Sequence, residues 1–243
     1  MIAESYNKSS NFWTRNQKKI QSDFLCRPYV IKLLGDVKGK SILDIGCGEG
    51  YMSRKLAQAG ASVTGVDIST KLINSARRQV DHNKKPEYLL KSALNLGRIN
   101  KKFDAAISVL VYGHLNVSEM NRANLEASKK LKKNGIFILA VPHPFYQIAK
   151  PKSRWVKFSI GAANYWQERS NLTLRRVDGE EFKVIKQYSH TFSDYLNNLI
   201  EVKFIVDTIV EPRPTATDLR QYSKMWGEES RLPTYLIIKS HLK

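Results

Sequence analysis

The segment Asp44 to Gly50, which reads Asp-Ile-Gly-Cys-Gly-Glu-Gly, constrains the fold of this chain more than any other feature. It ends an apolar run, Ser41 to Ile45, of the kind that forms a buried parallel strand. Glycines at positions 46, 48 and 50 let the backbone turn sharply and approach a ligand without obstruction from side chains. We therefore expect a strand, a glycine turn and a helix that bind a nucleoside-bearing cofactor.

The chain after this turn alternates between strand and helix patterns. The expected strands cover residues 62–66, 87–90, 104–110 and 136–141, and the expected helices cover residues 51–59, 70–80 and 118–131. This alternation predicts an α/β fold with a doubly wound, mostly parallel sheet and helices on both faces. At 243 residues the chain suits a single domain.

Two further regions flank this core. Apolar residues between about positions 11 and 34 recur at helical spacing, with Pro28 interrupting, and predict two short helices. After Pro142 an aromatic-rich stretch leads to a predicted β-hairpin with Asp178-Gly179 at its turn. We expect the helices and the hairpin to form a lid over the ligand site, with a bracing role as the alternative.

A helix over residues 193–201 and strands over residues 204–210 and 234–239 complete the expected elements. The single domain then divides into a helical cap (residues 1–39), a cofactor-binding core (40–142), a lid insertion (143–192) and a carboxyl-terminal part (193–243).

Composition bears on the partners and the compartment. Forty Lys and Arg against 22 Asp and Glu give a net charge of +18, which raises the question of a polyanionic partner. The basic residues occur as scattered pairs, such as Lys101-Lys102, which favours a solvated basic surface over a dedicated nucleic-acid face. Neither a membrane span nor a signal peptide is visible, and two cysteines indicate no disulfide framework. We expect a soluble, cytoplasmic protein.

Residues near the glycine turn bear on the choice of nucleotide cofactor, and Asp44 is the discriminating one, since either cofactor would have a ribose for Asp67. The dinucleotide fingerprint would place its third glycine at Tyr51, whereas this chain has Gly50 one position earlier. Asp67 ends the second strand, where a carboxylate can accept hydrogen bonds from both ribose hydroxyls. A buried Asp44 is costly unless it meets a cation or hydrogen-bond donors, and the methionine ammonium of S-adenosylmethionine would serve. The alternative is a carboxylate that only braces the turn.

The motif ILDIGCGEG, followed by VTGVDIS, KKFDAAISVLVYGHL and LKKNGIFILAVP, resembles the class I, Rossmann-like S-adenosylmethionine-dependent methyltransferases over about residues 40–142. The resemblance implies a seven-stranded sheet with an antiparallel last strand, S-adenosylmethionine as cofactor and S-adenosylhomocysteine as product. The cofactor-binding residues that it implies are Asp44, Gly46, Cys47, Gly48, Asp67, Ile68, Ser92, Ala93, Ser108 and Val109. Asp44 and the turn would surround the methionine, Asp67 would hold the ribose, and Ile68, Ser92 and Ala93 would face the adenine. Many relatives have Asp where Ser92 stands.

Methyl transfer from a sulfonium leaves a neutral leaving group, so the protein mainly aligns and desolvates the nucleophile. An acceptor hydroxyl or protonated amine must lose a proton, which suits histidine. His143, His114 and His190 are the catalytic candidates because they fall at the carboxyl edge of the predicted sheet. His143, between Pro142 and Pro144, is the first choice, and a structural role is the alternative for each. Aromatic residues that could wall an acceptor pocket, or simply pack, are Tyr6, Trp13, Phe145, Tyr146, Tyr165 and Trp166.

The main functional prediction is a methyltransferase that acts at an oxygen or nitrogen of a small-molecule metabolite, in a biosynthetic pathway, without a metal. An RNA or other nucleic-acid methyltransferase is the alternative, supported by the net charge of +18. Residues 108–112, however, lack the Asn/Asp-Pro-Pro-aromatic motif of many families that methylate nucleobase amines. A non-catalytic cofactor-binding module is a further alternative.

Overall fold

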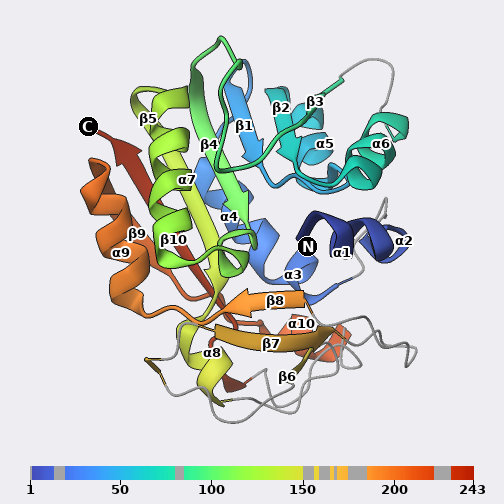
Figure 1. Ribbon diagram of the computed structural model, residues 1–243, viewed down its shortest axis with the longest axis vertical. Coiled ribbons are helices and arrows are strands. Elements are labelled where there is room, and N and C mark those ends of the chain that lie inside the picture. The colour runs from blue at the N-terminus through green and yellow to red at the C-terminus, as the bar shows by residue number, and fades with distance from the viewer. Residues whose placement is uncertain are drawn as a thin grey trace.

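The computed structural model describes residues 2–13, 20–79, 85–149, 156–158, 165–166, 169–174, 185–221 and 231–243. Its main sheet has seven strands in the order β3-β2-β1-β4-β5-β10-β9 (Figure 1). The strands are β1 (Ser41–Ile45), β2 (Ser62–Asp67), β3 (Glu87–Leu90), β4 (Phe103–Val109), β5 (Leu131–Pro142), β9 (Phe204–Val210) and β10 (Tyr235–Leu242). Only β10 runs antiparallel to both of its neighbours. The predicted seven-stranded, mostly parallel sheet is confirmed.

One strand is longer than its apolar run predicted. The expected strand began at Ile136, whereas β5 begins at Leu131 and its first residue pairs with Phe103 of β4. The register shifts after Phe103, and Asn134 has a positive φ of 60°. An irregular start of this kind accommodates the polar residues 132–134, which are exposed and carry no strand alternation.

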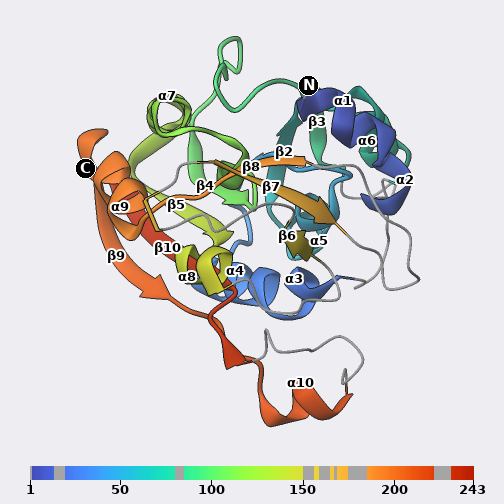
Figure 2. The same ribbon diagram turned by 60° about the horizontal axis from the view of Figure 1, so that its bottom comes forward.

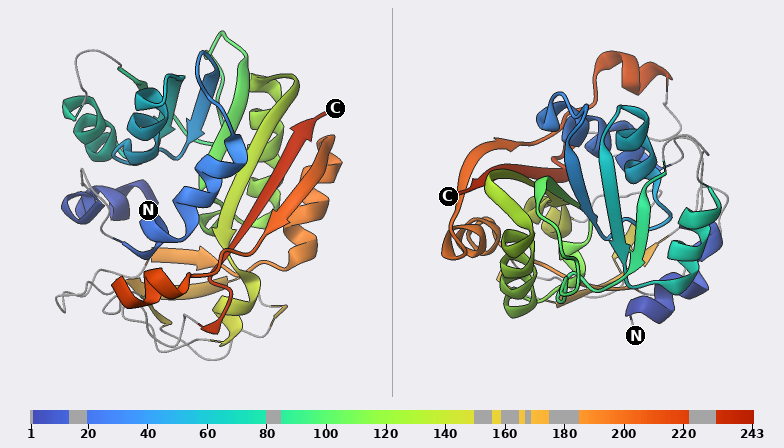
Figure 3. Two further views of the ribbon diagram at one scale, coloured as in Figure 1. Left: turned by 180° about the vertical axis from the view of Figure 1, so that it is seen from behind. Right: turned by 90° about the horizontal axis from the view of Figure 1, so that it is seen from above.

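Helices cover both faces of the sheet, as predicted. On one face α7 (Val117–Lys130) and α9 (Phe192–Glu201) pack over the larger apolar cluster, and on the other α4 (Cys26–Leu34) and α5 (Tyr51–Gln58) pack over a second. Figure 3, seen from behind, shows α4 in front of the sheet and α7 behind it. The helix α6 (Thr70–Arg78) lies beside β2 and β3 and starts after Ser69, whose side chain caps it.

The amino-terminal region contains more helices than the sequence predicted. Two helices were expected over about residues 11–34, whereas the described part of that region has three: α2 (Ser10–Trp13), α3 (Gln21–Phe24) and α4. A further helix, α1 (Ile2–Lys8), precedes them. The expectation that Pro28 interrupts a helix is wrong, because Pro28 is the third residue of α4. Backbone N–H groups in a first helical turn have no intrahelical partner, so the missing N–H of proline costs no hydrogen bond there.

A small three-stranded sheet lies beyond the carboxyl edge of the main sheet (Figures 1 and 2). Its order is β6-β7-β8, with β6 (Val156–Phe158), β7 (Arg169–Leu174) and β8 (Ile185–Tyr188). The predicted antiparallel pairing of β7 with β8 is confirmed, and the Asp178-Gly179 turn lies outside the described residues. Three short helices, η1 (Tyr112–His114), α8 (Pro144–Ala149) and α10 (Ala216–Gln221), complete the elements of the described chain. Within that part of the chain, no helix has the length and apolarity that a membrane span requires.

Candidate functional site

A cavity of about 380 Å³ opens at the carboxyl ends of the central strands. Its walls come from the glycine turn after β1, the segments that follow β2, β3 and β4, and the amino-terminal helices α1 to α4. This is the edge at which ligands bind in open α/β sheets. The strand order explains the location, because the chain turns outward from β1 in opposite directions toward β2 and β4.

The three glycines of the turn have different roles. All have positive φ, at 73° for Gly46, 57° for Gly48 and 84° for Gly50. A Cβ on Gly46 would collide with Val111, and one on Gly50 would collide with the ring of Tyr88, whereas a Cβ on Gly48 would meet no atom within 4 Å. Gly46 and Gly50 therefore permit close packing, and Gly48 leaves open space at the cavity wall where a ligand can approach.

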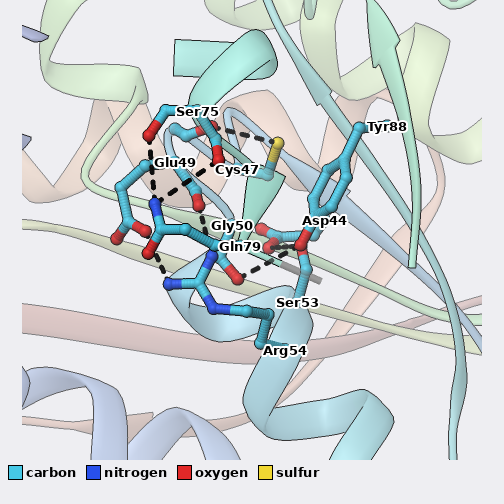
Figure 4. Close-up of polar contacts among 10 residues, drawn as sticks. Asp44, Cys47, Glu49, Gly50, Ser53, Arg54, Ser75, Gln79 and Tyr88 are labelled. Atoms are coloured by element: carbon cyan, nitrogen blue, oxygen red, sulfur yellow. Dashed lines mark hydrogen bonds and ion pairs between the residues drawn. The ribbon is translucent and has the colours of Figure 1, made fainter. Parts of the chain in front are cut away.

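Asp44 is the buried carboxylate behind this turn. It is 2% exposed, and Ser53 Oγ donates a hydrogen bond to its Oδ2 at 2.6 Å. Burial raises the pKa of Asp44 to about 6, against the opposing effects of the Ser53 hydrogen bond and the nearby Arg27 charge. Figure 4 shows Asp44, Ser53 and Tyr88 together at the start of α5. The hydrogen bonds and charges of the protein therefore do not fully compensate the burial of this carboxylate. A cationic group of a ligand would stabilise its ionised form.

A second carboxylate near the turn is neutralised within the protein. Glu49 is 3% exposed and lines the cavity, and Arg54 Nη2 lies 2.7 Å from its Oε2 (Figure 4). Because Arg54 belongs to α5, this ion pair ties the glycine turn to the helix that follows it. Asp44 is therefore a better candidate than Glu49 for binding a cationic group of a ligand.

Asp67 connects the two loops that flank the cavity. Its Oδ2 accepts a hydrogen bond from Gly48 N at 2.9 Å, and its Oδ1 accepts one from Ser69 N at 2.8 Å. Burial raises the pKa of Asp67, while the backbone hydrogen bonds act in the opposite direction. Each oxygen keeps acceptor capacity beyond these bonds, so Asp67 can shape the turn and still bind hydroxyls.

Two buried hydrogen-bond donors at the cavity wall have no acceptor among the residues that the structure describes. The Gln21 side chain accepts from Tyr235 Oη at 3.1 Å through Oε1, while its Nε2 has no partner. Arg27 pairs through Nη1 with Asp23 Oδ1 at 3.0 Å and with Ser22, and its Nε has no partner. Gln21, Arg27 and Tyr235 all line the cavity. Unpaired buried donors of this kind favour a ligand with acceptor oxygens, and a guanidinium edge suits a carboxylate.

A tyrosine and a histidine meet at another part of the cavity wall. Tyr6 Oη of α1 lies 2.7 Å from His114 Nε2 of η1, and their rings are edge to face with centroids 5.6 Å apart. Both residues line the cavity. Asn7 anchors α1 at the start of α6, because its Oδ1 accepts from Ser69 Oγ at 2.7 Å and from Lys71 N at 3.1 Å. The amino-terminal helix therefore spans the cavity from α6 to η1.

The cavity collects most of the predicted residues. Those that line it are Asp44, Gly46, Cys47, Gly48, Asp67, Ile68, Ser92, Ala93, Val109, His114, Tyr6, Trp13 and Tyr146. Those outside its lining are Ser108, His143, His190, Phe145, Tyr165 and Trp166. Ser108 is fully buried and donates to Ile45 O at 3.2 Å, so its side chain joins β4 to β1.

His143 does follow β5 at the predicted edge, but the structure does not bring it into the cavity. Its Nε2 lies 2.8 Å from Glu211 Oε1, its Nδ1 accepts from Phe145 N at 3.0 Å, and its ring packs edge to face on Phe192. Burial lowers the pKa of His143 despite Glu211. The two ring nitrogens thus connect the end of β5 to Glu211, directly after β9, and to α8, while the ring face packs on α9.

The remaining predicted side chains also have other surroundings. His190 is 2% exposed, its Nε2 bonds to Leu115 O at 2.8 Å, and its ring lies between Tyr188 and Tyr195. Tyr165 Oη accepts from the backbone N–H of residue 192 at 3.1 Å. The side chains of residues 145 and 166 are 56% and 80% exposed. They form no wall of the cavity that the structure describes.

Sequence reasoning missed Gln21, Arg27 and Tyr235. None belongs to a spaced motif, and Tyr235 lies 214 residues from its partner Gln21. The one local signal was Asp23 with Arg27 four residues later, which indicates a helical ion pair but no ligand site.

The chain is similar to known methyltransferases in sequence and in fold. Residues 43–139 match the family model described as a methyltransferase domain. The chain is 31% identical over 193 residues to a ubiquinone biosynthesis O-methyltransferase of Pelagibacter ubique, covering 70% of this chain and 76% of the relative. Among solved structures it is similar to an S-adenosylmethionine-dependent methyltransferase from Mesorhizobium loti, with 22% identity, a TM-score of 0.70 and coverage of 88% and 96% of the two chains. It is also similar to a magnesium protoporphyrin IX methyltransferase from Synechocystis with bound S-adenosylmethionine, with 18% identity, a TM-score of 0.63 and coverage of 100% and 95%.

Proposed function

Because this chain belongs to the class I S-adenosylmethionine-dependent methyltransferases, we propose that it transfers the methyl group to an oxygen or nitrogen of a small-molecule metabolite. One observation carries the proposal. A single cavity joins the glycine turn and Asp67 to the Tyr6–His114 pair. A cofactor bound at the glycine turn and Asp67 would then share one enclosed space with a nucleophile bound near Tyr6 and His114.

The polar groups of the cavity fit S-adenosylmethionine. Its amino-acid end carries an ammonium and a carboxylate, which match the buried Asp44 and the unpaired donors of Arg27 and Gln21. The negative charges of Asp23 and Asp44 would repel an isolated carboxylate, whereas a zwitterion brings its own positive charge. This charge pattern supports an amino-acid group at the wall formed by α3, α4 and the glycine turn.

The nucleoside end fits the part of the cavity lined by Asp67 and the residues after β2 and β3. Asp67 retains acceptor capacity for the ribose hydroxyls, and Ile68, Ser92 and Ala93 line the cavity beyond it. Lys91, at the same end of β3, is instead engaged with Gly97 O at 2.7 Å. We assign the adenine to this end, with an apolar contact from Ile68.

The cofactor, when bound, supplies an activated methyl group on a sulfonium, and the protein supplies position and a dry environment. Gly48 and Asp67 hold the two loops at a fixed separation, and α1 covers the cavity from the solvent side. We propose this cap, rather than the small sheet at residues 156–188, as the main barrier to water. His114 then takes the place of His143 as the candidate base.

The size and lining of the cavity support a small acceptor. A volume of about 380 Å³ falls in the range of small-molecule sites, and Trp13, Tyr146 and Tyr235 give it aromatic walls. The relative from Pelagibacter ubique is named for O-methylation in ubiquinone biosynthesis, which supports an oxygen nucleophile on a small molecule. Cys26 and Cys47 are buried free thiols, which supports a reducing compartment such as the cytoplasm.

Two measurements test the proposal. Thermal unfolding with S-adenosylhomocysteine should show stabilisation that nicotinamide dinucleotides do not give, and the reverse ranking would contradict the cofactor assignment. Incubation with methyl-labelled S-adenosylmethionine and separated cell-extract fractions should place the label in the small-molecule fraction. Label that appears only in the RNA fraction would support the nucleic-acid alternative instead.

A further inference from the structure

The Tyr6–His114 contact joins two elements that are far apart in the chain. Tyr6 belongs to the amino-terminal helix α1 and His114 to the turn after β4, 108 residues later, yet their polar atoms lie 2.7 Å apart. Both side chains line the cavity that contains the glycine turn. A hydrogen bond this short between a phenol and an imidazole is well suited to proton movement.

Neighbouring contacts hold Tyr6 in place. The adjacent Asn7 binds the start of α6 through Ser69 and Lys71, and the ring of Trp13 packs 5.8 Å from the Tyr6 ring. Trp13 is itself fixed, because its Nε1 donates to Ser9 Oγ at 3.0 Å. The phenol is therefore preorganised at the cavity wall rather than carried on a loose terminus.

Tyr6 keeps its proton in the resting protein. Burial raises the pKa of Tyr6 well above its usual range, and the negative charge of Asp67 raises it further. A stable tyrosinate is thus excluded as the resting base. A neutral phenol can still donate its hydrogen to one partner and accept a hydrogen from another through the same oxygen.

We propose that Tyr6 and His114 form a proton relay that deprotonates a phenolic hydroxyl of the methyl acceptor. This inference rests on the proposed methyltransferase function. The acceptor O–H passes its proton to Tyr6 Oη as the Tyr6 proton moves to His114 Nε2, leaving a neutral tyrosine, an imidazolium and an acceptor oxyanion. After methyl transfer to that oxygen, the imidazolium releases the proton to solvent. Each step conserves protons and needs no further reactant.

The class of acceptor follows from the acidity of the relay. Tyr6 starts and ends neutral, so the net proton transfer runs from the acceptor hydroxyl to an imidazole. For ordinary groups this is uphill by about 3.5 pKa units for a phenol, whereas an aliphatic alcohol is a far weaker acid and the transfer costs much more. The charged groups that share the cavity are Asp44, Glu49, Asp67, Lys91, Arg27 and Glu119. Asp67 is close enough to act on Tyr6, so its negative charge also favours the imidazolium that the relay creates. Trp13 and Tyr146 suit a flat ring beside the relay.

The first test needs no acceptor. In the S-adenosylhomocysteine complex of the full chain, ¹⁵N NMR of labelled histidine should show neutral His114 with its proton on Nδ1, because Tyr6 donates to Nε2. The Tyr6→Phe variant should change that tautomer balance and the titration of His114, whose signal a His114→Asn variant identifies. An unchanged tautomer and titration would overturn the relay.

A matched control distinguishes loss of the relay from a structural effect of removing any nearby tyrosine hydroxyl. Tyr112 lies in the same short helix η1 as His114, outside the cavity lining, and its buried hydroxyl has no partner within the described part of the chain. Tyr112→Phe should leave the His114 signal unchanged. A change equal to that of Tyr6→Phe would indicate a structural effect and would also overturn the relay.

The second test uses nitrocatechol, whose visible spectrum reports ionisation of its hydroxyl. Added to the S-adenosylhomocysteine complex, it should ionise at a lower pH than in solution. The Tyr6→Phe variant should return that pH to the solution value, because it has no hydroxyl that can pass the proton to His114. Absence of a spectral change in the wild-type complex would refute the phenolic class. Cofactor affinity is measured separately, so failure of S-adenosylhomocysteine to bind would refute the methyltransferase proposal and not the relay alone.

Discussion

Replacement of Asp44 by Asn should make the ligand-free protein more stable and the cofactor complex weaker. Asp44 is 2% exposed, and burial raises its pKa from 3.8 to about 6. That difference corresponds to about 3 kcal/mol against the ionised form in the folded protein, since each pH unit is worth about 1.4 kcal/mol. Asn removes the charge but adds an amide that needs its own partner, so a gain of about 1–3 kcal/mol is expected at neutral pH.

The stability difference between Asp44→Asn and the wild type should depend on pH in a direction that identifies its cause. Because the folded-state pKa is raised, the cost of Asp44 is fully present above about pH 6 and disappears as the pH falls toward 3.8. The stability advantage of Asp44→Asn should therefore shrink between pH 7 and pH 4. Urea unfolding at several pH values, with linear extrapolation to water, measures it directly.

The cofactor side of the same variant should move in the opposite direction. Loss of a charged hydrogen bond to the ligand ammonium is expected to cost about 2–3 kcal/mol, which is roughly a 30- to 150-fold weaker dissociation constant. Isothermal titration with S-adenosylhomocysteine measures this. Ser53 can still donate to the Asn oxygen, so the local hydrogen bond of the turn is retained.

Asp104 offers the matched control. Its pKa is lowered to about 2, mainly by Lys132, whose Nζ lies 2.6 Å from it, and by Ser41. Since the group is half-buried and screened by solvent, Asp104→Asn should destabilise the protein by no more than about 1 kcal/mol, with unchanged affinity for S-adenosylhomocysteine. If Asp44→Asn destabilises the free protein, or binds the ligand as tightly as wild type, Asp44 is a structural brace and the reasoning is refuted.

Three further predictions concern the turn, the core and the displaced histidine. Gly48→Ala should weaken binding of S-adenosylhomocysteine at least about tenfold and lower the free energy of unfolding by about 1 kcal/mol. Gly50→Ala should lower the free energy of unfolding by more than about 3 kcal/mol, because the added Cβ collides with Tyr88 at a backbone φ of 84°. Tyr112→Phe should stabilise the protein by about 1 kcal/mol, because it removes a buried hydroxyl without a partner; a loss of stability in urea unfolding would show that the hydroxyl is bonded. His143→Ala should leave cofactor affinity and turnover intact but destabilise the fold by about 1–2 kcal/mol, less so below pH 6.5, since burial lowers the pKa of His143 and acid already weakens the wild type; a large fall in turnover would restore it as a catalytic candidate.

Much of the fold could be predicted because parallel strands buried on both faces are nearly continuous apolar runs. The bounds of β1, β3 and β9 coincide with the predicted ones, and Ser69 marks the start of α6 as expected. These signals are local, since they depend on side chains within one element. They fail at the start of β5, where exposed polar residues continue the strand only because β4 lies beside it.

The amino-terminal helices show where local signals end. The helix α1 has seven residues and none of them is fully buried, so its sequence has no apolar stripe from which the helix could be predicted. A helix this short is not stable alone, and its position depends on Asn7 at α6 and Tyr6 at His114. Both partners lie more than 60 residues away, which no reading of spacing could supply.

Strand order decides which of His143 and His114 lines the cavity. The sequence predicted that both lie at the carboxyl edge of the sheet, but not which side chain enters the cavity. Both residues follow strands at the same edge, but β4 is next to β1, whereas β5 is one strand further away. Val111, between β4 and η1, packs against Gly46 where a Cβ would collide with it. The missing side chain of Gly46 thus lets η1 approach the cofactor turn and brings His114 within reach of Tyr6. The glycine that permits a sharp turn also positions the second half of the site, so Gly46→Ala should disrupt the His114 environment as well as cofactor binding.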